Sequence, residues 1–240
     1  MRRPAVLVLA GHDPTGGAGL IADAESVRAM GAWPLTVPTA LTSQTTVDVV
    51  SLTPRPFEEI VGTARALLED CGAEAIKVGL IADEESLEAV VTLCRAYAHL
   101  PLVIDPVLKA GGGVELSNAA LTAAFVRRLL PLATLSTPNM LELSRLVAEE
   151  DDAIGRDGDE ERQSHAIERR VRALLPAGSG AMLVTGTDVP GRAGGDEVIH
   201  RLYQKVPNVS GAGRALPGAS TARAVRFQAP SPPGLPGDRA

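Results

Sequence analysis

The sequence is poor in aromatic side chains and has no excess of positive charge. Phe, Trp and Tyr make up 2% of the 240 residues, so the core must be built from Ala, Val, Leu and Ile. The aromatic stacking platforms of proteins that bind single-stranded nucleic acid are therefore missing. The net charge is −6, so Lys and Arg are not in excess. Proteins that bind nucleic acid need such an excess to neutralise the phosphates. Both shortages argue against a nucleic-acid partner.

Cysteine and long hydrophobic runs are scarce as well. Cys71 and Cys94 are too few for a disulfide framework and are not spaced for zinc, so we expect core or surface thiols rather than nucleophiles. No run of about 18 apolar residues exists, so we expect no membrane span. The apolar stretch after Arg2 and Arg3 is only about as long as a strand and does not suit a secretory leader. These absences favour a cytoplasmic protein.

Short apolar runs alternate with helical patterns along a chain long enough for one sizeable domain. The predicted strands are Val6–Leu9, Leu35–Thr39, Ala75–Val78, Leu102–Ile104, Ala133–Leu135 and Met182–Val184. The predicted helices are Leu20–Met30, Phe57–Asp70, Glu84–Tyr97, Asn118–Leu130, Met140–Val147 and His165–Leu175. This alternation predicts an α/β fold with a mostly parallel sheet and helices on both faces.

Residues suited to ligand binding follow the predicted strands. Ligands bind beyond the carboxyl ends of the strands in such sheets. Glycines, carboxylates, amides and hydroxyls stand at these ends: Gly11, Asp13, Gln44, Gly79, Asp105, Asn139, Thr185 and Gly186. Each residue alone could be a turn or a cap, but their joint placement predicts a small-molecule site at one edge of the sheet.

The glycine-rich segment Ala10–Gly19 is the most informative stretch. It leads from an apolar strand to a helix, where bare backbone N–H groups can face a ligand. It is not a P-loop, because Gly17 and Ala18 stand where Lys and Ser or Thr are needed. It also fails as a dinucleotide fingerprint, since no acid near residue 42 could hold a ribose. A structural turn and a binding loop both remain open.

Two other places could hold a metal or a phosphate. Asp105 precedes the glycines Gly111–Gly113. Its carboxylate could bind a metal or a substrate hydroxyl, or it could simply cap a helix or turn. Asn139 and Glu142 could hold the waters of a Mg²⁺ ion or form an ordinary capping box. The acidic stretch Glu149–Glu161 is interpreted as a solvated loop rather than a metal cluster.

The composition changes after about Gln204. Residues 205–240 contain six prolines and five glycines and show no apolar periodicity, so we expect this tail to be disordered. The predicted folded domain therefore covers residues 1–204.

Five motifs together resemble the hydroxymethylpyrimidine/phosphomethylpyrimidine kinases of thiamine synthesis, a branch of the ribokinase-like superfamily. They are AGHDPTGGAGL from Ala10, TALTSQ from Thr39, IKVGL from Ile76, VIDPV from Val103 and TPNxxE from Thr137. The resemblance runs from about Ala5 to about Gln204, and the order of five motifs makes it specific at the level of the family.

The resemblance implies a ribokinase-like three-layer sandwich, ATP and Mg²⁺ as cofactors, and a homodimer. The expected reaction phosphorylates 4-amino-5-hydroxymethyl-2-methylpyrimidine and then its monophosphate. Two alternatives stay open: a pyridoxal kinase of the same superfamily, and a non-catalytic protein that only binds the pyrimidine.

The resemblance also implies roles for particular residues. The expected pyrimidine-binding residues are Gly11, Asp13, Asp23, Gln44 and Val107. The expected ATP and phosphate residues are Asp105, Asn139, Thr185 and Gly186, and the expected metal ligands are Asn139 and Glu142.

One motif of the family is missing. The family closes its site with a segment of the form (H)G[ST]GC, whose backbone N–H groups hold phosphates and whose Cys is the base. Residues 205–240 contain no such segment, so no catalytic base is assigned. Reading the codons from Ala215 to Pro233 in a shifted frame permits LPGSFHGSGCTLSSAIAA. We therefore expect a frameshifted C-terminus and impaired activity, and simple divergence of this segment stays open as the alternative.

Overall fold

The computed structural model describes residues 3–107, 118–148, 160–175, 180–186, 197–205 and 220–228. The strands are β1 Ala5–His12, β2 Trp33–Gln44, β3 Val49–Pro54, β4 Ala75–Val78, β5 Leu102–Ile104, β6 Leu135–Ser136, β7 Ala181–Val184, β8 Glu197–Lys205 and β9 Ser220–Gln228. The helices are α1 Gly19–Ala29, α2 Phe57–Cys71, α3 Glu84–Ala96, α4 Ala119–Arg128, α5 Met140–Leu146 and α6 Glu160–Leu174, with a 3₁₀ turn at Leu130–Leu132.

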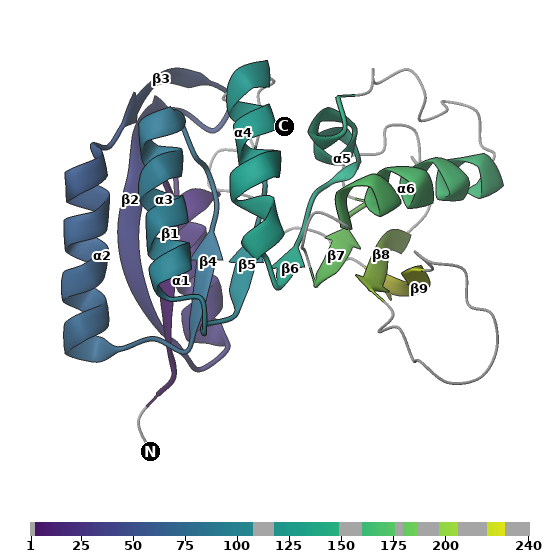
Figure 1. Ribbon diagram of the computed structural model, residues 1–240. Helices are drawn as coiled ribbons and strands as arrows, with labels where there is room; N and C mark the ends of the chain where they lie inside the picture. Colours follow the sequence, from purple (N-terminus) through teal and green to yellow (C-terminus); the bar gives the residue numbers. More distant parts are fainter. Residues whose placement is uncertain are drawn as a thin grey trace.

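All the described strands form one sheet in the order β3-β2-β1-β4-β5-β6-β7-β8-β9 (Figure 1). The six central strands of this order, β2-β1-β4-β5-β6-β7, pair in parallel. Strand β3 at one edge and strands β8 and β9 at the other are antiparallel. The parallel strands all end at one edge of the sheet, so the loops that follow them lie together. The predicted fold class is confirmed.

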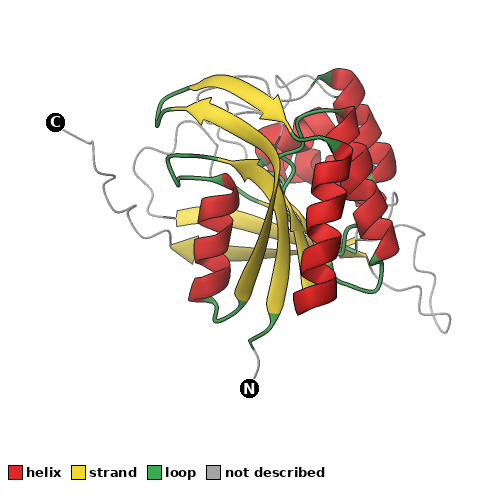
Figure 2. Ribbon diagram, turned by 90° about the vertical axis from the view of Figure 1, so that its left-hand side faces the viewer, coloured by secondary structure: helices red, strands yellow, loops and turns green. Residues whose placement is uncertain are grey.

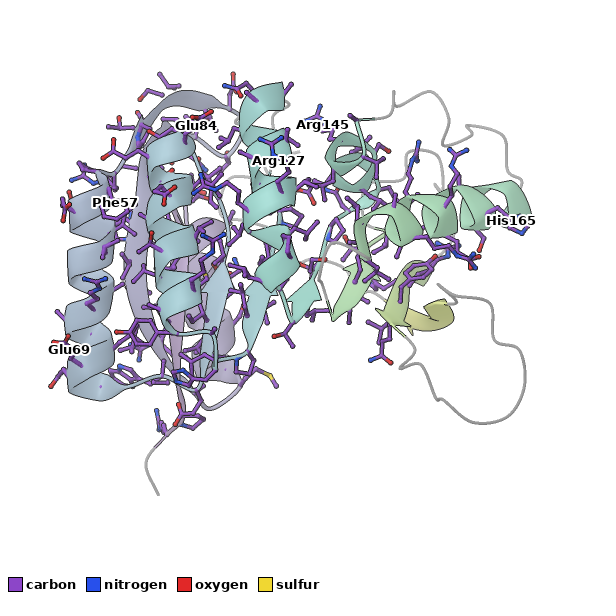
Figure 3. All side chains as sticks on the ribbon, in the orientation of Figure 1. Phe57, Glu69, Glu84, Arg127, Arg145 and His165 are labelled. Carbon is purple, nitrogen blue, oxygen red and sulfur yellow. The ribbon has the colours of Figure 1, made fainter. Side chains whose placement is uncertain are left out.

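Helices cover the two faces unequally. Helix α1 lies on one face, and α2, α3 and α4 lie on the other (Figure 2). Successive side chains of β1 point to opposite faces of the sheet. Leu7 and Leu9 join the large core, whereas Val8 and Ala10 join a small cluster with Leu20 of α1. The outer sides of the larger helix layer carry exposed charged side chains: Glu69, Glu84 and Arg127 (Figure 3).

The face of the sheet that carries α1 is incompletely covered beyond β4. Val103, Leu135 and Ala181 occupy paired positions on β5, β6 and β7, so they share one face. All three are only half-buried, whereas their strand neighbours Ile104 and Met182 are fully buried in the large core. Among the described helices, only α1 packs on this face.

The structure differs from the sequence analysis at the edges of the sheet. Strands β3 and β8 were not predicted. Strand β9 lies within the tail expected to be disordered and pairs with β8 along its whole length. The expected disorder therefore does not extend to Ser220–Gln228, whereas residues 206–219 and 229–240 lie outside the described residues.

Two predicted loops are only partly described. Residues 149–159 of the acidic stretch and all of Gly111–Gly113 lie outside the described residues. Glu160 and Glu161 begin α6, so the loop prediction is wrong for these two. Among the described residues, no helix is long and apolar enough to cross a membrane.

Candidate functional site

Two adjoining cavities lie at the carboxyl ends of the parallel strands. The first, of about 500 Å³, is bounded by the β1–α1 loop, the ends of β2 and β3, and β4. The second, of about 450 Å³, is bounded by the ends of β5, β6 and β7. Lys77, Asp105 and Val107 line both cavities. A molecule in one cavity can therefore meet a molecule in the other at these three residues.

The glycine-rich loop is held in shape by Asp13. This carboxylate is 5% exposed; its Oδ1 accepts from the Thr15 N–H at 2.8 Å and its Oδ2 accepts from the Ala18 N–H at 2.9 Å. Both carboxylate oxygens thus bind backbone, although Asp13 also lines the first cavity. The loop is both a structured turn and a wall of the cavity, so the two interpretations of the sequence are compatible.

Gly19 fixes the point where the loop becomes α1. Its φ is +59°, and a Cβ there would lie 2.2 Å from the carbonyl oxygen of Gly11. Gly19→Ala is expected to lower stability by at least about 1–3 kcal/mol, because strained φ and a backbone clash combine. Thermal unfolding measures this. Gly62→Ala in α2 is the control, since its Cβ meets nothing within 4 Å and alanine favours helix. Equal stability of the two variants would contradict the prediction.

The structure brings the expected pyrimidine-binding residues together. Gly11, Asp13, Asp23, Gln44 and Val107 all line the first cavity. Gln44 stands at the end of β2, half-buried, and its amide can both donate and accept hydrogen bonds. Such a group suits the edge of an aminopyrimidine.

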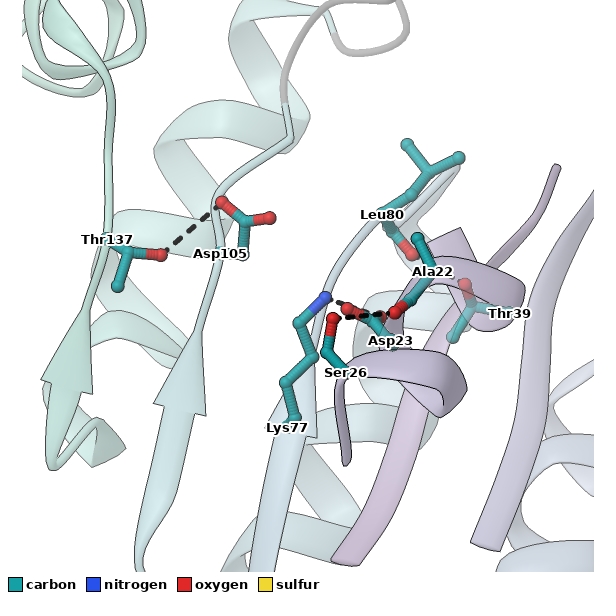
Figure 4. A network of polar contacts seen from close by, with 8 residues as sticks. All are labelled: Ala22, Asp23, Ser26, Thr39, Lys77, Leu80, Asp105 and Thr137. Carbon is teal, nitrogen blue, oxygen red and sulfur yellow. Dashed lines mark hydrogen bonds and ion pairs between the residues drawn. The ribbon is translucent and has the colours of Figure 1, made fainter. Parts of the chain in front are cut away.

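A charged pair that sequence reasoning missed lies between the cavities. Lys77 points from β4 toward α1, where its Nζ lies 2.6 Å from Asp23 Oδ2 (Figure 4). The signal was present in the sequence, because a lysine inside a short apolar strand must find a partner or a ligand. The Lys77–Asp23 pair also means that the Asp23 carboxylate is partly neutralised before any ligand binds.

Asp105 faces this pair from the end of β5. The Thr137 hydroxyl donates to its Oδ1 at 3.4 Å (Figure 4). Burial raises the pKa of Asp105 above its ordinary value; Lys77 lowers it, Asp23 raises it, and the Thr137 hydrogen bond lowers it. Because burial is the largest of these effects, Asp105 is a carboxyl whose ionised form is poorly solvated. A cation arriving beside it would be bound favourably.

The second cavity carries oxygen ligands. Asn139 and Glu142 form a capping box at the start of α5: Asn139 Oδ1 accepts from the Glu142 N–H at 2.8 Å, and Glu142 Oε2 accepts from the Asn139 N–H at 2.9 Å. Both residues and Thr185 line the cavity, and Thr185 forms a β-bridge with Asn139. Gly186 is not among the lining residues. The capping-box interpretation is confirmed, and it orients both side chains beside the cavity.

These oxygen atoms fit a magnesium ion held partly through water. Asp105, Thr137, Asn139 and Glu142 offer carboxylate, hydroxyl and amide oxygens, which are the ligands of hard cations. Among the described residues, no group of three His, Cys, Asp or Glu side chains forms a metal cage. Mg²⁺ commonly binds through one or two carboxylates together with substrate phosphates, so the set present is suitable.

The cysteines take no part in either cavity. Cys94 is buried in the core, where burial raises the pKa of its thiol to about 12, and Cys71 is half-buried at the end of α2. A thiol with such a pKa is not ionised near neutral pH and is a poor nucleophile. Neither cysteine lines a cavity, as the sequence analysis expected.

The family model and the curated relatives below agree on one family. The family model described as phosphomethylpyrimidine kinase matches residues 13–227. The hydroxymethylpyrimidine/phosphomethylpyrimidine kinase of Escherichia coli is 32% identical over 186 residues, which is 78% of this chain and 66% of that protein. The Streptomyces coelicolor protein of the same name is 37% identical over 60% of this chain and 53% of its own length. The matched regions thus span between half and two thirds of these relatives.

Solved structures show the same likeness. The phosphomethylpyrimidine kinase of Clostridium difficile 630 superposes with a TM-score of 0.70 and 25% identity, covering 85% of this chain and 81% of that one. A pyridoxal kinase from Staphylococcus aureus in complex with ADP gives a TM-score of 0.68 and 25% identity over 85% of this chain and 69% of that one. The family match covers most of the chain and the fold agrees with it, so this chain belongs to the phosphomethylpyrimidine kinase family.

Proposed function

We propose that this chain binds 4-amino-5-hydroxymethyl-2-methylpyrimidine and its monophosphate in the first cavity, and MgATP with its phosphates in the second. The observation that carries the proposal is the junction of the cavities at Lys77, Asp105 and Val107. A phosphoryl acceptor on one side and a donor on the other would meet there. Family membership supports the assignment to a phosphotransferase.

In the proposed reaction, the hydroxymethyl oxygen attacks the γ-phosphorus of ATP. A new O–P bond forms, the bond from the γ-phosphorus to the β–γ bridging oxygen breaks, and ADP leaves with that electron pair. The hydroxyl proton is released to solvent water, since no catalytic base is assigned in this chain. Gln44 would orient the pyrimidine ring, and Asn139 and Thr185 would border the nucleotide phosphates. Most of the catalysis is positioning and charge stabilisation, as in other phosphoryl transfers.

Bound Mg²⁺ would neutralise charge on the ATP phosphates. Asp105 and Glu142 would hold it, with Asn139 beside them. The excess of oxygen ligands around the second cavity supports this arrangement, because an ATP tetra-anion next to two carboxylates would otherwise be repelled.

We propose further that turnover by this chain is weak. Residues 205–240 contain no glycine–cysteine segment to hold the transferred phosphoryl group. Strand β9 occupies Ser220–Gln228 of that stretch. Substrate binding and chemical turnover are therefore expected to separate, with the pyrimidine half of the site retained.

The test is calorimetric titration of the purified chain with the hydroxymethylpyrimidine and, separately, with pyridoxal. We expect binding of the pyrimidine and about tenfold or greater weakening in Gln44→Ala, which loses hydrogen bonds in a half-buried site. Gln204→Ala is the control, since Gln204 is exposed on β8 and lines neither cavity. Preference for pyridoxal, or equal affinities of both variants, would overturn the substrate assignment.

A further inference from the structure

Lys77 is the only Lys or Arg that lines either cavity among the described residues. The carboxylates around it are Asp13, Asp23, Asp48, Asp105 and Glu142. A neutral alcohol can enter such an acidic site without a large electrostatic penalty. A phosphate monoester carries about two negative charges near pH 7 and would be repelled unless a cation met it.

Lys77 is held where such a phosphate would lie. Its ammonium is bound to Asp23 at 2.6 Å, with both side chains about one-fifth exposed. Gly79 leaves room for it, because a Cβ at that position would lie 3.0 Å from Lys77 Nζ and 3.1 Å from the Ala10 Cβ. The ammonium therefore stands at the junction of the cavities, partly open to solvent and held by one carboxylate.

We infer that Lys77 is the specificity-determining residue that lets one pocket accept both the neutral pyrimidine alcohol and its phosphate monoester. The inference rests on the proposed function. With the alcohol bound, Asp23 balances the charge of Lys77. With the monoester bound, the ammonium is shared between Asp23 and the ester phosphate. The same contact holds the product of the first phosphorylation in place as the acceptor of the second.

Replacing Lys77 and replacing Asp23 are expected to change the ratio of monoester to alcohol affinity in opposite directions. Lys77→Met removes the cation and leaves Asp23 unpaired, so affinity for the monoester falls about 10–100-fold more than affinity for the alcohol. Asp23→Asn frees the ammonium from its partner, so the ratio of monoester to alcohol affinity rises. Lys77→Arg keeps the charge and is expected to restore most of the ratio that Lys77→Met loses.

The experiment is calorimetric titration of the full chain and the three variants with the hydroxymethylpyrimidine and with its monophosphate. Work at pH 8 keeps the ester dianionic and ordinary histidines neutral. The readout is the ratio of monoester affinity to alcohol affinity, which is the dissociation constant of the alcohol divided by that of the monoester. A purely structural defect changes both affinities together and leaves this ratio unchanged. If Lys77→Met does not fold, the ratio for Asp23→Asn against the unmodified chain still decides the matter.

An unchanged ratio in the folded variants overturns the role of Lys77 and leaves the proposed function standing. Failure of the unmodified chain to bind either pyrimidine overturns the proposed function, and the inference with it. A lower ratio for Lys77→Met and a higher ratio for Asp23→Asn support the inference. Higher salt is also expected to lower the ratio of monoester to alcohol affinity in the unmodified chain. The contact between Lys77 and the ester phosphate is electrostatic, and Lys77 is partly exposed.

Discussion

Replacing residues 215–233 with LPGSFHGSGCTLSSAIAA, a sequence that the shifted frame permits, is expected to raise turnover of the hydroxymethylpyrimidine by about 10⁴-fold or more. One lost oxyanion-type donor usually costs about 10²–10³ in rate, and a lost general base about 10²–10⁴. The replacement supplies both in a single segment. Steady-state assays of ADP release with the natural and the replaced chain measure the gain.

The same replacement removes β9 and its pairing with β8, but it is expected to raise thermal stability on balance. Val103, Leu135 and Ala181 are half-buried on the face of β5, β6 and β7 that α1 leaves uncovered among the described helices. A helix after the glycine–cysteine turn could remove part of this apolar surface from water, at roughly 25 cal/mol for each Å² buried. A matched control carries the replacement with its Cys changed to Ala, which keeps the helix and removes the base.

Two outcomes would contradict this prediction. One is turnover by the natural chain at about 1 s⁻¹ or faster, which is already in the usual range for kinases. The other is a gene whose shifted frame does not encode the glycine–cysteine segment. The control separates the effects: it should keep the gain in melting temperature and lose most of the gain in rate.

The sheet was predictable where sequence pattern and packing agree. Ala75–Val78 and Leu102–Ile104 were predicted with the boundaries that β4 and β5 have, because short apolar runs between helices are typical of buried parallel strands. Strand β3 was not predictable in this way. None of its residues, Val49–Pro54, is buried, and its place is set by pairing with the long strand β2 rather than by burial.

The sequence predicted which residues line the site but not which contacts they make with one another. Strand ends identified Asp13 and Asp105, and the structure places both along the first cavity. Spacing alone could not show that Asp13 gives both carboxylate oxygens to backbone N–H groups, or that Asp23 is paired with Lys77. The second pair joins residues of separate elements, and only the packing of α1 over β1, the neighbour of β4 in the sheet, brings it together.

Asp105→Asn is expected to stabilise the protein at pH 8 and to lower turnover in the chain with the replaced segment. The folded pKa of Asp105 is raised, chiefly by burial, so the unfolded chain ionises this carboxyl more readily than the folded one. The folded state therefore loses stability as pH rises through that pKa. Below the ordinary aspartate pKa of about 3.9 the carboxyl is neutral in both states and the penalty is absent. Asparagine removes the penalty at every pH.

The measurement is thermal unfolding of both proteins from pH 3 to pH 8. The melting temperature of Asp105→Asn should exceed that of the natural chain at pH 8, and the difference should disappear near pH 3. Glu69→Gln, at an exposed position on α2, is the control and should show no such pH-dependent gain. In the chain with the replaced segment, Asp105→Asn should lower turnover by about 10²-fold or more, since it removes a carboxylate that would hold the Mg²⁺ on the ATP phosphates. A variant that is less stable at pH 8 would show that the Asp105 carboxylate is held mainly by attraction to Lys77 and not opposed by burial.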